Sequence, residues 1–148
     1  MESPSRPEAP QRDDPPRRLV LVVEDEPQVM RFLRATLTAH EYRLVEATTG
    51  QQALLEAATR SPDLVILDLG LPDLDGYQVA RALRAEAALR STYLVALSGY
   101  AQAEDIRRSL DAGFDAHLGK PAPLDQLHAL LASERPVPED RPPAAGDL

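Results

Sequence analysis

The chain has 148 residues, a length typical of one domain, and its composition excludes several classes of protein. It contains no cysteine, which excludes disulfides and thiolate metal sites, and its net charge of −8 disfavours a general nucleic-acid-binding surface. No apolar stretch approaches the roughly 18 residues of a membrane span, and the N-terminus lacks the apolar core of a secretion signal. We therefore expect a cytoplasmic protein without membrane contact.

Prolines separate a core from two tails. Residues 1–17 and 134–148 contain most of the 14 prolines, with mixed charges and few large apolar side chains. Segments of this composition bury too little apolar surface to offset the entropy lost on ordering. We predict that both tails are disordered, the second one acidic, and that residues 18–133 form the folded domain.

Short apolar runs alternate with segments of helical periodicity through this core. In chain order, we predict a strand at 19–23 and a helix from Pro27, a strand at 43–47 and a helix capped by Thr49, a strand at 63–68 and a helix from Gly76 to Ala88, a strand at 92–97 and a helix over 103–110 that ends before Gly113, and a strand at 115–118 and a helix from Pro123. Such alternation predicts a parallel sheet covered by helices on both faces.

Polar residues follow four of the predicted strands. Glu24 and Asp25 come after the first strand, Asp68 ends the third, Ser98 ends the fourth and Lys120 follows the fifth. The carboxyl ends of parallel strands share one edge of the sheet, where ligands of such sheets bind. We therefore expect three carboxylates, a hydroxyl and the only lysine of the chain to converge there.

The three carboxylates predict a metal site. Clustered carboxylates repel one another unless a cation compensates, and oxygen ligands without His or Cys suit Mg²⁺. The histidines, in contrast, are widely spaced in the sequence at His40, His117 and His128, so we do not expect a histidine metal cluster. The oxygen ligands thus predict magnesium at Glu24, Asp25 and Asp68.

The same residues can support phosphoryl transfer. A carboxylate can attack phosphorus to give an acyl phosphate. The transition state spreads negative charge over three oxygens, which Mg²⁺, the Lys120 ammonium and the Ser98 hydroxyl could stabilise.

Five motifs resemble the receiver domain of two-component response regulators. They are VVEDEP at 22–27, DLGLPDLDG at 68–76, ALSGY at 96–100, GFD at 113–115 and GKP at 119–121. The match covers about residues 18–133, and its details are similar to receivers attached to hybrid sensor kinases. The resemblance implies a flavodoxin-like (βα)5 fold, which is a doubly wound parallel five-stranded sheet in the order 2-1-3-4-5.

The resemblance also implies roles for the site residues. Asp68 would accept a phosphoryl group from the phosphohistidine of a histidine kinase or phosphotransfer protein. Asp25 and Asp68 would bind Mg²⁺, as would Glu24 through a water molecule and Gly70 through its backbone carbonyl. Ser98 and Lys120 would contact the phosphoryl group or its carboxylate, and a cis Lys120–Pro121 bond would follow. Such a domain is a stoichiometric acceptor that dephosphorylates itself, rather than a turnover enzyme.

Family members commonly signal through the face built by the fourth helix, fifth strand and fifth helix. The candidate contact residues on this face are Ile106, Arg107, His117 and Leu127, either for an unknown output protein or for a homodimer. His117 departs from the family pattern, which usually has Tyr or Phe there as part of an aromatic switch. We expect no direct DNA binding, because residues 134–148 are too short to form a DNA-binding unit.

Two other functions stay open at this point. One is a receiver-like scaffold that binds a partner without being phosphorylated. The other, less favoured, is a phosphatase with an aspartate nucleophile. Such enzymes usually have a second acid two residues after the nucleophile, where this chain has Gly70.

Overall fold

A computed structural model describes residues 18–99, 103–122 and 124–134 of the chain. Its strands are β1 (Leu19–Val23), β2 (Arg43–Ala47), β3 (Leu64–Asp68), β4 (Tyr93–Ser98) and β5 (Ala116–Gly119). They form one parallel sheet in the order β2-β1-β3-β4-β5, which confirms the predicted flavodoxin-like topology. Every residue of β1 and β3 is buried, as expected for apolar runs at the centre of a sheet covered on both faces.

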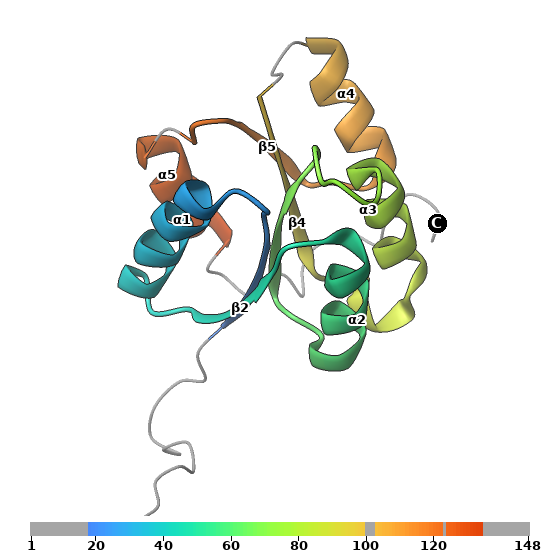
Figure 1. The fold of residues 1–148 in the computed structure, drawn as a ribbon, viewed down its shortest axis with the longest axis horizontal. Helices are drawn as coiled ribbons and strands as arrows, with labels where there is room; N and C mark the ends of the chain where they lie inside the picture. The colour runs from blue at the N-terminus through green and yellow to red at the C-terminus, as the bar shows by residue number, and fades with distance from the viewer. Residues whose placement is uncertain (1–17, 100–102, 123, 135–148) are drawn as a thin grey trace, which may run out of the picture.

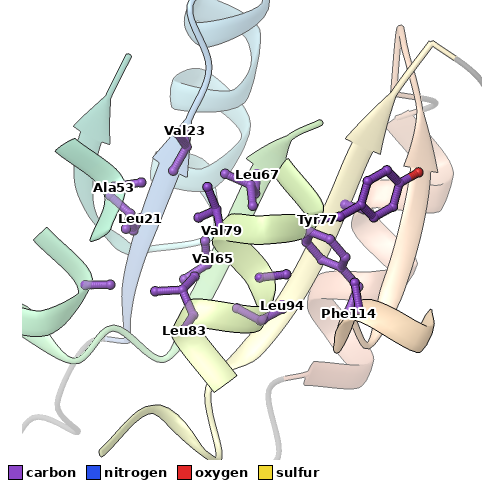
Figure 2. Close-up of a cluster of buried hydrophobic side chains, with 14 of the residues drawn as sticks. Leu21, Val23, Ala53, Val65, Leu67, Tyr77, Val79, Leu83, Leu94 and Phe114 are labelled. Carbon is purple, nitrogen blue, oxygen red and sulfur yellow. The ribbon is translucent and has the colours of Figure 1, made fainter. Parts of the chain in front are cut away.

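Helices cover both faces of the sheet (Figure 1). α1 (Pro27–Ala39) and α5 (Leu124–Glu134) pack on one face, whereas α2 (Gly50–Arg60), α3 (Gly76–Ala85) and α4 (Ala103–Ala112) pack on the other. Figure 2 shows the core on the second face, where Tyr77, Val79 and Leu83 of α3 meet strand side chains. Among the described residues, no helix is long and apolar enough to cross a membrane.

Side-chain hydrogen bonds fix the start of α2. Thr49 caps α2 as predicted, because its side chain accepts a hydrogen bond from the Gln52 N–H. Asp73, in the loop after β3, adds a second cap by accepting from the N–H groups of Gly50 at 2.7 Å and Gln51 at 3.0 Å. The loop that leaves the sheet edge at β3 is thereby attached to the start of α2.

The helix predicted over 76–88 is shorter in the structure. It ends at Ala85 because Glu86 is extended, with ψ of 124°, and a 3₁₀ turn, η1 (Ala87–Leu89), follows. This break buries Leu89, which is 2% exposed, and lets Arg84 donate hydrogen bonds to nearby carbonyl groups. Tertiary packing therefore overrides the helical propensity of the alanine-rich segment.

The other boundaries agree with the predictions to within a residue or two. Strands β3, β4 and β5 each begin one residue later than expected. Gly113 follows α4 with a φ of +112°, a backbone conformation that residues with a side chain rarely adopt. This explains why the helix ends before Gly113, as predicted. Pro123, where the last helix is predicted to begin, lies outside the described residues, and so does most of the two tails that are predicted to be disordered.

Candidate functional site

The sheet's hydrogen-bond ladder positions the site residues at the carboxyl ends of the strands. The Glu24 N–H donates to the Ala47 carbonyl at 3.0 Å, which extends the β1–β2 pairing by one residue. The Lys120 N–H donates to the Ser98 carbonyl at 2.8 Å, which does the same for β4 and β5. The backbone beside the site is therefore as fixed as the sheet itself.

Three carboxylates meet at this edge. Each of Glu24, Asp25 and Asp68 offers an oxygen, and these oxygens lie within 4.8 Å of one another. Glu24 and Asp68 are 1% and 4% exposed, whereas Asp25 is open to solvent. The site thus combines two buried carboxylates with one that faces solvent.

Backbone N–H groups orient two of these carboxylates. The Gly70 N–H donates to Oδ1 of Asp68 at 3.0 Å, and the Glu26 N–H donates to Oε2 of Glu24 at 2.9 Å. The other oxygen of Asp68, Oδ2, faces Lys120. The two oxygens of Asp68 therefore lie in different surroundings, one held by the backbone and one beside an ammonium group.

Lys120 brings one positive charge into the cluster. Its Nζ lies 3.2 Å from Oε1 of Glu24 and 3.4 Å from Oδ2 of Asp68. Glu26, which the sequence did not identify, has an oxygen 3.9 Å from the same Nζ but a side chain that is 62% exposed. Lys120 is followed by a cis peptide bond to Pro121, as the resemblance implied. The predicted meeting of Lys120 with Glu24 and Asp68 is confirmed.

Burial and charge shift the pKa values of two groups. The pKa of Glu24 is raised, mainly because burial disfavours its charged form and also because Asp68 is near, although the Glu26 N–H and Lys120 oppose this. For Lys120, burial alone would lower the pKa, but the carboxylates of Asp68 and Glu24 outweigh it and raise the pKa. The ammonium form of Lys120 is therefore favoured at neutral pH.

The donor set fits a hard divalent cation. Oε1 of Glu24 is buried and, among the described residues, makes no hydrogen bond, although it lies 3.2 Å from the Lys120 ammonium. When all three carboxylates are ionised, a single ammonium leaves them with an excess of negative charge. Oxygen ligands with unbalanced negative charge are what Mg²⁺ prefers, and water completes its coordination.

Ser98 and Gly70 lie at the same edge. Ser98 ends β4 and is 5% exposed, and its backbone pairs with Gly119, next to Lys120. Gly70 is exposed, and an added Cβ there would touch only Oδ1 of Asp68, at an ordinary 3.7 Å. All the residue types of the predicted site are thus present at one edge.

The predicted contact face is only partly a surface. Ile106, which is 36% exposed, and Arg107 lie on the outside of α4. His117 is half-buried on β5. Its Nε2 is buried and makes no hydrogen bond within the part of the chain that is described, and burial lowers its pKa against the opposing charge of Asp105. Leu127 is 0% exposed and packs in the core on the α1–α5 face, so its expected role as a surface contact is wrong.

The sequence matches the profile of the response regulator receiver domain over residues 20–132. The chain belongs to the response regulator receiver domain family. It is 48% identical over 112 residues to the KDP operon transcriptional regulatory protein KdpE of Escherichia coli, a match that covers 76% of this chain and 48% of that protein. The chain therefore spans about half the length of this curated relative, and the likeness concerns the receiver part alone.

Solved receiver domains have the same fold. The receiver domain of the sensor histidine kinase PA1611 from Pseudomonas aeruginosa PAO1, with a magnesium ion coordinated in its active-site cleft, is 31% identical with a TM-score of 0.73; the match covers 80% of this chain and 97% of that one. The BeF3-activated receiver domain of Klebsiella pneumoniae RstA is 30% identical with a TM-score of 0.72, over 78% and 97% of the two chains. The sequence-based assignment to this family is confirmed.

Proposed function

We propose that this receiver domain accepts a phosphoryl group on Asp68 from the phosphohistidine of a histidine kinase or phosphotransfer protein. The observation that carries the proposal is the environment of Asp68. One of its oxygens is held by the Gly70 N–H, while the other faces the Lys120 ammonium at 3.4 Å. Asp68 is nearly buried, and the neighbouring Asp25 is exposed, so the phosphodonor would approach from the Asp25 side.

The chemistry is a displacement at phosphorus. A carboxylate oxygen of Asp68 forms the new O–P bond, the N–P bond to the donor imidazole breaks, and that imidazole leaves with the electron pair and takes up a proton. Lys120 stabilises the negative charge that develops on the phosphoryl oxygens. Ser98 is the candidate hydrogen-bond donor to those oxygens once the group is attached.

Glu24, Asp25, Asp68 and the Gly70 carbonyl are the proposed magnesium ligands, with Glu24 acting through a water molecule. Mg²⁺ would supply neutralisation of the charge on the phosphoryl oxygens and the carboxylates. The magnesium ion in the PA1611 receiver domain supports this assignment. So does the excess of negative charge around the buried, unsatisfied Oε1 of Glu24.

The output is a change in protein–protein contacts. We propose that Ile106, Arg107 and His117, on the α4–β5–α5 face, contribute to contacts with an output protein or with a second copy of the domain. The domain would act in the cytoplasm as a stoichiometric acceptor that hydrolyses its own acyl phosphate slowly, rather than as a phosphatase that turns over substrate.

The test is phosphorylation of the full chain by acetyl phosphate and by a phosphorylated histidine kinase. We expect at most one phosphoryl group per chain, dependent on Mg²⁺ and abolished in Asp68→Asn. Asp111→Asn, which changes an exposed carboxylate on α4, is the matched control and should behave as wild type. Incorporation that persists in Asp68→Asn would refute the proposal.

Two companion measurements, beryllofluoride binding and phosphoester turnover, separate the two alternatives. A scaffold that does not use phosphate would bind neither Mg²⁺ with beryllofluoride nor a phosphoryl group. A phosphatase would release many phosphates per chain from a small phosphoester in steady turnover.

A further inference from the structure

Two histidines far apart in the sequence meet at the surface. His40 follows the last residue of α1, and His128 lies on α5. Nε2 of His40 lies 2.6 Å from Nδ1 of His128, and the ring centroids are 4.7 Å apart with the rings tilted by 39°. Figure 1 shows α1 and α5 side by side on one face of the sheet. The wide spacing of the histidines along the chain gave no sign of this contact.

The pair lies at the opposite end of α1 from the acidic site. That helix begins at Pro27, immediately after the Glu24–Glu26 acids, and its 13 residues extend about 20 Å before His40 is reached. The two sites also differ in chemistry, since the acidic site offers oxygen ligands and the histidine pair offers ring nitrogens. They therefore select different metal ions.

The ring geometry is close to that of a metal site. A single hydrogen can lie between the facing nitrogens, so at least one of them presents a lone pair to the other. Two nitrogen ligands at about 2.0–2.1 Å from a tetrahedral zinc ion lie about 3.3 Å apart. The pair would have to open by less than about 1 Å, which ring rotation can provide because His128 is exposed and His40 is partly exposed.

We propose that His40 and His128 form a binding site for a divalent transition-metal ion of the zinc type, with the ion replacing the shared hydrogen. Imidazole nitrogen is a preferred ligand of Zn²⁺ and Cu²⁺ and a poor one for Mg²⁺. Within the described part of the chain, the two imidazoles are the ligands that the geometry assigns to this ion. A pocket lined by Ala39, His40, Glu41 and Ala132 adjoins the pair.

A bound ion would connect the end of α1 to α5. The histidine pair already forms a side-chain hydrogen bond between the end of α1 and α5. Because α5 belongs to the proposed output face, an ion held here would restrain one side of that face without touching Asp68. An ion that binds the folded chain through two helices also stabilises it.

The test uses Cu²⁺ as a spectroscopic probe on the full chain, with excess Mg²⁺ present to occupy the acidic site. We expect one Cu²⁺ per chain, with hyperfine coupling to imidazole nitrogens in the electron paramagnetic resonance spectrum. Even indirect partners of metal ligands are worth about 10- to 100-fold in affinity, so His40→Gln and His128→Gln should each weaken binding at least about tenfold. His117→Gln, which changes the remaining histidine, is the matched control and should bind as wild type.

Zn²⁺ provides a second readout, since it should raise the melting temperature of the wild type and of His117→Gln but not of the two pair variants. Circular dichroism of each variant without metal establishes that it folds. Nitrogen coupling and affinity that survive in both His40→Gln and His128→Gln would overturn the proposal. A copper spectrum that shows oxygen ligands alone would overturn it equally.

Discussion

Replacing Lys120 with methionine should destabilise the domain through the charge balance at the sheet edge. The Lys120 ammonium lies 3.2 Å from Glu24 and 3.4 Å from Asp68, and the Glu24 side chain is 0% exposed. At these separations and an effective dielectric of about 20, each attraction is about 5 kcal/mol before desolvation is subtracted. Breaking a buried ion pair by removing one partner costs about 3–5 kcal/mol.

Since the Lys120 side chain is 20% exposed, we expect the lower end of that range, about 3 kcal/mol. For a domain of this size, such a loss lowers the melting temperature by about 10–15 °C. The assay is thermal and urea unfolding of Lys120→Met in EDTA, with Lys120→Arg as the matched variant that keeps the charge. A melting temperature within about 3 °C of wild type for Lys120→Met would refute the reasoning.

The stability difference between wild type and Lys120→Met should depend on pH, because the pKa values of Glu24 and Lys120 are both shifted. Glu24 has a raised pKa in the folded state. Its ionisation therefore lowers the free energy of unfolding as pH rises from 4.5 through that raised pKa, and this loss is absent in acid. Lys120 has a raised pKa, so its contribution is complete below 10.5 and lost as pH rises through the folded value. The difference between wild type and Lys120→Met should be largest near neutral pH and shrink in acid. Added Mg²⁺ should also narrow the difference, because the proposed magnesium site uses the same carboxylates.

Three further predictions concern contacts at helix ends and in the loops. Arg84→Met should lower the free energy of unfolding in urea by about 2–4 kcal/mol, because the Arg84 guanidinium donates to several backbone carbonyls and pairs with Asp115 at 2.6 Å. The control Arg81→Met, at an exposed position of the same helix, should change that free energy little, and equal effects of the two substitutions would contradict the prediction. N–H groups at the start of α2 lower the pKa of Asp73, so the stabilisation by its carboxylate is lost as pH falls through that lowered value. Asp73→Asn should remove this part of the acid dependence of stability, and an unchanged acid-unfolding midpoint would count against the cap. Gly113→Ala should cost about 1–3 kcal/mol in thermal unfolding, since its φ is +112° and a Cβ would lie 2.7 Å from Cγ of Arg84; a neutral result would show that the turn relaxes freely.

The residues that meet at the sheet edge could be predicted from the sequence, because the patterns that identify them are local. Each site residue directly follows a continuous apolar run, and the carboxyl ends of parallel strands meet at one edge whatever the details of packing. Glu24, Asp68 and Lys120 therefore converge as expected. The order of the strands, in contrast, came from the family resemblance, because periodicity alone does not tell which strands are neighbours.

What the sequence missed depends on contacts between distant segments. Arg84 looks like an ordinary surface residue of an alanine-rich helix, yet its guanidinium connects the turn after α3 to Gly113 and Asp115. Leu127 has the same hydrophobic character as a surface contact would have, and only the packing of α5 buries it. His40 and His128 are 88 residues apart, so no spacing rule could pair them.

Asp68 is the proposed phosphoryl acceptor among the 24 acidic residues of the chain. The most direct measurement is to phosphorylate the full chain in the presence of Mg²⁺, trap the acyl phosphate by reduction with borohydride, and locate the modified residue by peptide mass spectrometry. We expect modification at Asp68 and no modified peptide when Mg²⁺ is chelated. Modification at Asp25, at Glu24 or at a residue outside the sheet edge would contradict this assignment.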